Sequence, residues 1–184
     1  MRKHQRDRGT KWKWAPAVQR TVNQVVAEFY RSDPHQRTGL RVLELIGKNW
    51  TATPSLFEGT YDYYEALLKT TDHLLQGLLQ DRDSHSIVIE APQIYAKKRK
   101  NCPGPLLVCK KTSQSCVLRT YWVEIPCEVE NLQSIAWGLY SAIQEPLPDR
   151  LEVVHVLSGR RTRLPIKSPS HSQSVTLKTI TEGA

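Results

Sequence analysis

The sequence contains no long hydrophobic run. None of its apolar stretches approaches the roughly 18 residues that a membrane-spanning helix needs, and the first dozen residues lack the apolar stretch of a secretory signal. Hydrophobic residues make up 39% and charged residues 24% of the 184 residues, which excludes wholesale disorder and fibrous architectures. We therefore expect one compact domain with tails and no membrane span, located in the cytoplasm or the nucleus.

Familiar catalytic motifs are also absent. The chain has no G-x-S-x-G, no P-loop, no G-x-G-x-x-G and no H-E-x-x-H sequence. Asp81, Asp83 and His85 could present three metal ligands on one side of an extended segment, so a small metal-dependent hydrolase is one hypothesis. Polar residues at a turn between a helix and a strand explain the same pattern. We favour that explanation and expect no enzymatic activity, no metal and no cofactor.

The cysteines lack the spacing of a common zinc module. Cys102, Cys109, Cys116 and Cys127 are separated by six, six and ten residues, whereas zinc modules usually supply ligand pairs two to four residues apart. A hairpin that turns about residues 112–113 would place Cys109 directly opposite Cys116. An intracellular chain normally keeps such cysteines reduced, so we expect buried thiols.

Positive charge is concentrated in two blocks. The chain carries 26 Lys and Arg against 18 Asp and Glu, a net charge of +8. Residues 1–20 contain seven basic and one acidic residue, and residues 97–119 contain seven basic and no acidic residues. Such blocks predict a polyanionic partner: nucleic acid, an anionic membrane surface or an acidic protein.

Three segments have helical periodicity before residue 81. The first begins near Pro16 and should end before Asp33, because the residue that precedes a proline disfavours helix. A second, short helix is expected between an N-cap at Thr38 and Gly47, although a strand is possible there. The longest helix covers about residues 60–80. The side chains expected to face the core are Val18, Val22, Val25, Val26 and Phe29, then Leu40, Leu43 and Ile46, then Tyr64, Leu67, Leu68, Thr71, Leu75, Leu78 and Leu79.

The remainder of the chain reads mainly as strands. Short β-rich runs cover residues 87–89, 106–109, 116–125, 151–157 and 161–166, and residues 129–143 regain helical spacing. This order predicts an α+β fold: an antiparallel sheet of about 4–5 strands, covered on one face by two or three helices, among them those at 60–80 and 129–143. We expect a flexible basic arm over residues 1–14, one domain over 15–167 and a flexible polar tail over 168–184.

Clustered cations and tryptophans are the best candidates for binding. Lysines alternate with tryptophans just before the first helix and could pair phosphate with stacked bases, although tryptophans here could equally pack against the protein. If Arg161 and Arg163 lie on a strand they share one face, opposite Thr162 and Leu164, and could bind phosphate or guard a strand edge. The candidate nucleic-acid-binding residues are Lys11, Trp12, Lys13, Trp14, Lys97, Lys98, Arg99, Lys100, Lys110, Lys111, Arg119, Arg160, Arg161 and Arg163.

These features favour a non-enzymatic nucleic-acid-binding protein. RNA or single strands are favoured over duplex DNA, because the Trp-Lys segment suits stacking and no groove-reading motif is recognisable. The alternative is a protein-interaction or assembly module, in which the chain forms a homo-oligomer or binds another protein. The basic run at residues 97–100 would then serve nuclear import or an anionic surface.

Overall fold

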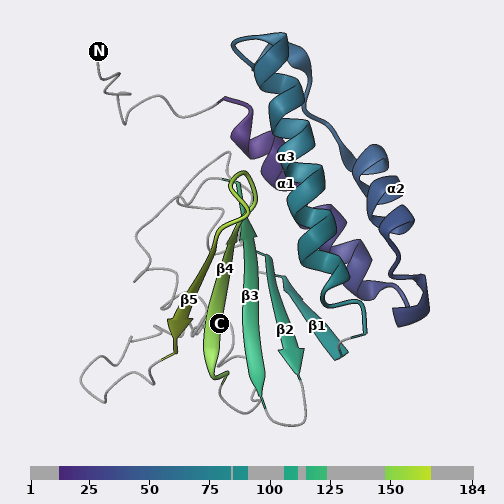
Figure 1. Cartoon of the computed structure of the whole chain (residues 1–184), viewed down its shortest axis with the longest axis vertical. Coiled ribbons are helices and arrows are strands. Elements are labelled where there is room, and N and C mark those ends of the chain that lie inside the picture. The colour runs from purple at the N-terminus through teal and green to yellow at the C-terminus, as the bar shows by residue number, and fades with distance from the viewer. Residues whose placement is uncertain (1–12, 84, 91–105, 112–114, 124–147, 167–184) are drawn as a thin grey trace, which may run out of the picture.

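Three α-helices precede five β-strands in the described part of the chain (Figure 1). The computed structural model describes residues 13–83, 85–90, 106–111, 115–123 and 148–166. The α+β class is confirmed. The helices are α1 (Ala15–Arg31), α2 (Gly39–Asn49) and α3 (Thr60–Leu79), with short 3₁₀ turns at Pro34–Gln36 and Pro54–Leu56; the strands are β1 (His85–Glu90), β2 (Leu106–Lys111), β3 (Cys116–Trp122), β4 (Arg150–His155) and β5 (Arg161–Pro165).

The sheet is mixed. Its spatial order follows the chain, β1-β2-β3-β4-β5, and three of the four pairings are antiparallel, but β3 and β4 run parallel. The expectation of a wholly antiparallel sheet is therefore wrong at this pairing. A parallel pair needs a crossover of a dozen or more residues, and the chain between the two strands is long enough to supply one.

Helix α1 packs against the sheet and against both other helices. Its five expected core residues, Val18, Val22, Val25, Val26 and Phe29, are all fully buried, so the predicted apolar face is confirmed. The Gln19 side chain joins the helix to the end of β3. Its amide nitrogen donates to the carbonyl of Tyr121 at 2.8 Å, and its amide oxygen accepts from the backbone N–H of Val123 at 2.8 Å.

Helices α2 and α3 bury only part of the faces expected: Ile46 and Leu78 are buried as predicted, but other members of each stripe are exposed. In α2 the buried side chains are Val42, Leu45, Ile46 and Asn49, while Leu40 and Leu43 are exposed, and the helix continues past Gly47. Both stripes satisfy helical spacing, so periodicity could not choose between them. In α3 the fully buried positions are Ala66, Thr70, Leu74, Gly77 and Leu78, whereas Tyr64 and Leu68 face outward. This face combines the small residues Ala66 and Gly77 with Leu74 and Leu78, which are among the largest fully buried side chains.

A second apolar cluster lies on the sheet face that points away from the described helices. It comprises Leu107, Cys109, Cys116, Leu118, Trp122, Leu151 and Val153. The expected pairing of Cys109 with Cys116 is wrong: Cys109 pairs with Leu118, and Cys116 pairs with Lys111. The two sulfur atoms are nevertheless 3.2 Å apart, as buried thiols on diagonal positions of one face. The helix expected at 129–143 lies outside the described residues.

None of the helices that the structure describes has the combination of length and hydropathy needed to cross a membrane.

Candidate anion-binding surface on the sheet

Cationic side chains from four neighbouring strands share one face of the sheet. We call this set the basic face; it consists of Lys110 on β2, Arg119 on β3, Arg150 on β4, and Arg161 and Arg163 on β5. Strand register places them together, because Arg119 pairs with Glu152, and Glu152 pairs with Arg163. Side chains two residues apart on a strand project on the same side, so Arg150 and Arg161 join this row.

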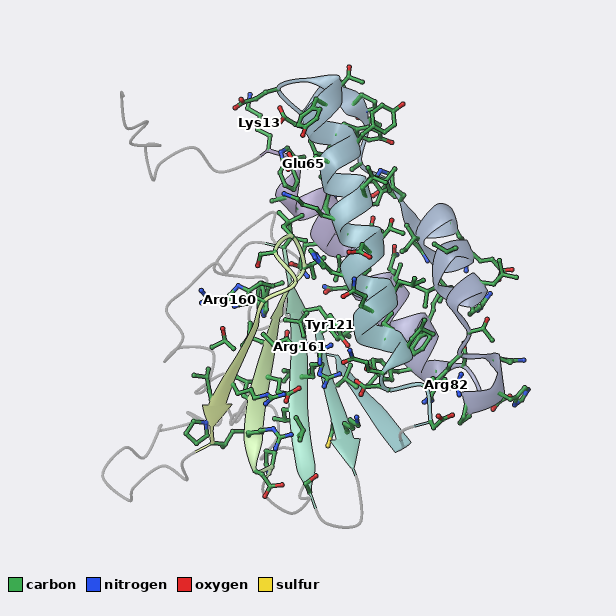
Figure 2. The ribbon with its side chains drawn as sticks, in the orientation of Figure 1. Lys13, Glu65, Arg82, Tyr121, Arg160 and Arg161 are labelled. Atoms are coloured by element: carbon green, nitrogen blue, oxygen red, sulfur yellow. The ribbon has the colours of Figure 1, made fainter. Side chains whose placement is uncertain are left out.

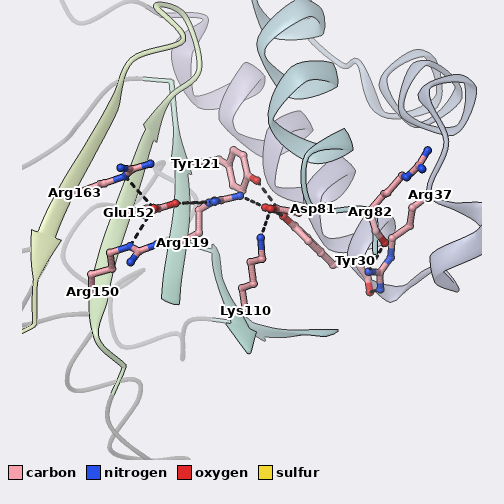
Figure 3. Close-up of polar contacts among 10 residues, drawn as sticks. All are labelled: Tyr30, Arg37, Asp81, Arg82, Lys110, Arg119, Tyr121, Arg150, Glu152 and Arg163. Atoms are coloured by element: carbon pink, nitrogen blue, oxygen red, sulfur yellow. Dashed lines mark hydrogen bonds and ion pairs between the residues drawn. The ribbon is translucent and has the colours of Figure 1, made fainter. Parts of the chain in front are cut away.

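Glu152 organises three guanidinium groups. Its carboxylate accepts from Arg119 Nε at 3.0 Å and from Arg119 Nη2 at 2.7 Å, both on Oε2. The other oxygen, Oε1, lies 3.3 Å from Arg150 Nε and 3.2 Å from Arg163 Nε. Glu152 is only 2% exposed because these side chains surround it. Figure 3 shows the carboxylate between its three arginine partners.

Asp81 occupies the other side of Arg119. This residue follows α3, and its carboxylate accepts hydrogen bonds from Lys110 Nζ, from Arg119 Nη1 and, at 3.0 Å, from the Tyr30 hydroxyl. The Tyr30 and Tyr121 hydroxyl groups are 3.2 Å apart. Asp81 therefore connects the helical layer to β2 and β3 through charged hydrogen bonds (Figure 3).

The pKa values of this network reflect burial and opposed charges. Burial raises the pKa of Glu152, but hydrogen bonds and charge from Arg119 and Arg150 outweigh it and hold this pKa below its ordinary value. Burial, together with the neighbouring Tyr121, raises the pKa of Tyr30 well above its ordinary value. Glu152 is therefore ionised and Tyr30 protonated at neutral pH.

Cations outnumber anions on this surface. Within the described residues, the five cations of the basic face are opposed by the two buried carboxylates of Asp81 and Glu152. The side chains of Arg163 and Arg150 are 67% and 44% exposed, and that of Lys110 is 25% exposed. The charge balance and exposure together leave cationic groups accessible to an anion from solution.

The turn between β4 and β5 packs against α3 beside this surface. His73 on α3 has its Nδ1 2.6 Å from the carbonyl oxygen of Val156. Gly159 in the turn has a φ of +67°, and a Cβ there would approach the His73 ring to 2.7 Å. Arg160 and Arg161 follow the turn directly; both are labelled in Figure 2, on the sheet side of α3. The helix thus fixes where β5 begins and where its arginines project.

The candidate arginines of the last hairpin are arranged as expected. Arg161 and Arg163 share a face, while Leu164 packs against the opposite cluster and Thr162 Oγ1 lies 2.9 Å from His155 Nε2. Arg119 differs, since it is 6% exposed and bound to Asp81 and Glu152. Its buried charge contributes to the electrostatic potential of the surface. Its guanidinium group holds the carboxylates of Asp81 and Glu152 in position.

The end of the basic arm that the structure describes is anchored. Trp14 is half-buried, and its ring stacks on Phe57 with centroids 4.9 Å apart and planes at 15°. This contact is the one that the packing alternative predicts. Lys13 is exposed beside it (Figure 2).

Several candidate residues belong to other parts of the chain. Those that lie outside the described residues are Lys11, Trp12, Lys97, Lys98, Arg99 and Lys100, and the described part of Lys111 is its backbone in β2. Their contribution to nucleic-acid binding therefore stays a prediction.

Sequence reasoning overlooked Glu152, Arg150 and the role of Asp81. Glu152 interrupts the apolar run of β4 with a single acidic residue. A lone charge at a position that should be buried requires a partner, and that signal could have identified Glu152. For Asp81, the sequence pattern predicts only a metal ligand or a turn residue. The carboxylate oxygens accept hydrogen bonds from Lys110, Arg119 and Tyr30. Asp81 therefore binds cationic side chains of the protein itself.

Among the described residues, no group of three or more His, Cys, Asp or Glu side chains is arranged to hold a metal ion. In comparisons with known proteins, no family model, no curated protein and no solved structure matches this chain.

Proposed function

We propose that this chain is a non-enzymatic nucleic-acid-binding protein that holds a phosphate backbone on its basic face. The observation that carries the proposal is the gathering of Arg150, Arg161 and Arg163 with Lys110 over two buried carboxylates. Phosphate oxygens are the natural partners of exposed guanidinium groups in a row, because each group offers paired N–H donors as well as charge.

The exposed side of α3 supports RNA or a single strand over duplex DNA as the ligand. A helix that enters the major groove of DNA needs basic or neutral side chains on its exposed side. The exposed side of α3 instead carries Asp62 and Asp72, with Glu65 between them in an ion pair with Lys69. The cations lie on the sheet, and sheet surfaces bind extended single strands in several RNA-binding folds.

The proposal is tested by binding of a fluorescently labelled single-stranded RNA, measured by anisotropy over a series of salt concentrations. Affinity should fall linearly on a log–log plot as salt rises, because bound phosphates release counterions. Affinity that is indifferent to salt would remove the proposal.

A matched pair of charge reversals localises the binding. Arg163 and Arg82 have similarly exposed side chains, 67% and 63%, but Arg82 follows α3 at the far side of the molecule (Figure 2). Arg163→Glu should weaken RNA binding much more than Arg82→Glu. Equal effects of the two variants would show that net charge, and no particular surface, governs binding.

A second candidate function, docking of a partner protein, is favoured by an exposed stripe on α3. Tyr61, Tyr64 and Leu68 are 79%, 55% and 67% exposed, at positions that share one side of the helix. The flanking Asp62 and Asp72 make this side acidic. Two copies packed through α3 would oppose like charges, so the stripe fits a partner helix with apolar residues and basic flanks.

This alternative is tested with a synthetic amphipathic helix built from leucine and lysine. Docking on the stripe predicts that the peptide binds the protein, that Leu68→Asp abolishes binding, and that a leucine–glutamate peptide does not bind. Binding that survives Leu68→Asp, or failure of the lysine peptide to bind, would dismiss it.

A further inference from the structure

We propose that Arg150 and Arg163 form a two-guanidinium clamp for one phosphodiester group, and that Glu152 is the positioning residue that sets the separation of the two arginines. The clamp rests on the proposed function, since the phosphodiester it takes is one of the bound nucleic acid. It adds the claim that recognition on this face depends on geometry and not on charge alone.

Both guanidinium groups form an ion pair with Glu152 through Nε, and the contact of Arg150 is also a hydrogen bond. Each places its Nε near a single oxygen, Glu152 Oε1, at 3.3 Å for Arg150 and 3.2 Å for Arg163. The other oxygen of Glu152 is engaged by Arg119. The two Nε atoms therefore converge on one fixed point between β4 and β5.

This attachment leaves the far side of each arginine available. Each arginine contacts Glu152 through Nε, and the side chains of Arg150 and Arg163 are 44% and 67% exposed. A guanidinium held by its Nε still presents two Nη groups in a plane. Two such planes on neighbouring strands can donate to different oxygens of one phosphodiester.

Glu152 also reduces the conformational entropy that the two arginine side chains lose on binding. An exposed arginine samples many rotamers, and ordering such a side chain costs free energy at the moment of association. Here the carboxylate orders both side chains beforehand. Arg119 in turn holds the carboxylate in place, because it binds Glu152 on one side and Asp81 on the other.

An interaction governed by charge and one governed by geometry predict opposite effects of Glu152→Gln on RNA affinity. Glu152→Gln removes a negative charge from the centre of the basic face, so an interaction governed by charge alone should become tighter. If Glu152 positions the clamp, the same substitution should weaken RNA binding, because the arginines lose their common anchor. Tighter binding by Glu152→Gln would overturn the clamp.

If Glu152→Gln prevents folding, conservative replacements of the two arginines test the clamp instead. Arg150→Lys with Arg163→Lys preserves charge at two exposed positions but removes the planar donors. We expect about tenfold weaker binding to single-stranded RNA at every salt concentration, with an unchanged salt dependence. Arg82→Lys is the control and should bind as the unaltered protein does. Affinity of the double variant within about twofold of the unaltered protein would overturn the clamp.

The clamp and the proposed function can fail separately. Inorganic phosphate, titrated into labelled protein, should shift the NMR signals of the Arg150 and Arg163 Nε–H groups and leave that of Arg82 in place. Such shifts without RNA binding would retain the phosphate site and remove the proposed function. RNA binding that depends on salt but not on the lysine replacements would retain the function and remove the clamp.

Discussion

Arg119 is the residue on which the polar network of the sheet depends. It is buried between Asp81 and Glu152, whose side chains are each 3% exposed. A buried charge is tolerated when its partners are charged and well oriented, and it becomes costly when a partner is removed.

Replacement of Arg119 by methionine should therefore lower the free energy of unfolding by about 3–5 kcal/mol, since it leaves Glu152 without its main buried partner. Urea denaturation measures this value. Arg163→Ala, at a side chain that is 67% exposed, serves as the control and should cost at most about 1 kcal/mol. A small loss for Arg119→Met would show that the network contributes little to stability.

Two glycines are expected to respond to alanine in opposite directions. Gly159 has a φ of +67°, and a Cβ at this position would come within 2.7 Å of His73, whereas a Cβ at Gly47 would meet no atom within 4 Å. Gly159→Ala should destabilise the protein by at least about 1–2 kcal/mol, because the left-handed backbone conformation strains an alanine even without the clash. Gly47→Ala, on the exposed side of α2, should stabilise the protein by about 0.5–1 kcal/mol. Thermal denaturation of both variants checks the pair, and stabilisation by Gly159→Ala would contradict the described turn.

At the scale of elements, sequence periodicity located the helices and strands well. It left open which side of a helix is buried and how the strands pair. The large aliphatic side chains of α1 form a single stripe of valines, so the facing of this helix was predictable. Helices α2 and α3 carry apolar residues around more of their circumference, and tertiary packing decided which side is buried.

The β2–β3 register shows a related limit. Moving the partner of Cys109 from Cys116 to Leu118 is a shift of two residues, which keeps every side chain on its face. Hydrophobic alternation fixes a register only against shifts of one residue, so turn geometry had to decide. The parallel pairing of β3 and β4 was equally inaccessible, because nothing local to either strand specifies its direction relative to the other.

The bonds between β3, β4 and β5 through Glu152 should make the stability of the sheet depend on pH. The pKa of Glu152 lies below its ordinary value of 4.5 in the folded protein, so the folded state binds its proton less readily than the unfolded chain. The stabilisation is complete above that ordinary value and is lost as pH falls through the lower folded value.

We therefore expect the free energy of unfolding to decrease as pH falls from the ordinary value of 4.5 through the lower folded value. Urea denaturation across this range measures the decrease. Glu152→Gln, whose side chain does not titrate, should show a smaller decrease. An identical pH dependence in the two proteins would show that Glu152 is not the group responsible.

At the scale of the whole molecule, charge distribution was the part of the candidate site that sequence could predict. Lys110, Arg119, Arg161 and Arg163 were recognised as cations of interest, and strand pairing brings them onto one surface. Their carboxylate partners could not be assigned. Asp81 is 38 residues from Arg119, and Glu152 is 33 residues from it, so the pairing depends on how α3 and β4 meet β3.

The central claim is that exposed arginines of the basic face contact nucleic-acid phosphates directly. The most direct measurement is the slope of log affinity against log salt for a single-stranded RNA, compared between the unaltered protein and Arg150→Ala with Arg163→Ala. Each phosphate contact on a single strand adds about 0.7 to this slope, and the two arginines hold one phosphodiester group, so the double variant should have a slope smaller by about 0.7. Arg20→Ala with Arg82→Ala removes the same charge from exposed positions outside the basic face and should leave the slope unchanged. An unaltered slope in the first variant, or the same reduction in both, would contradict the account.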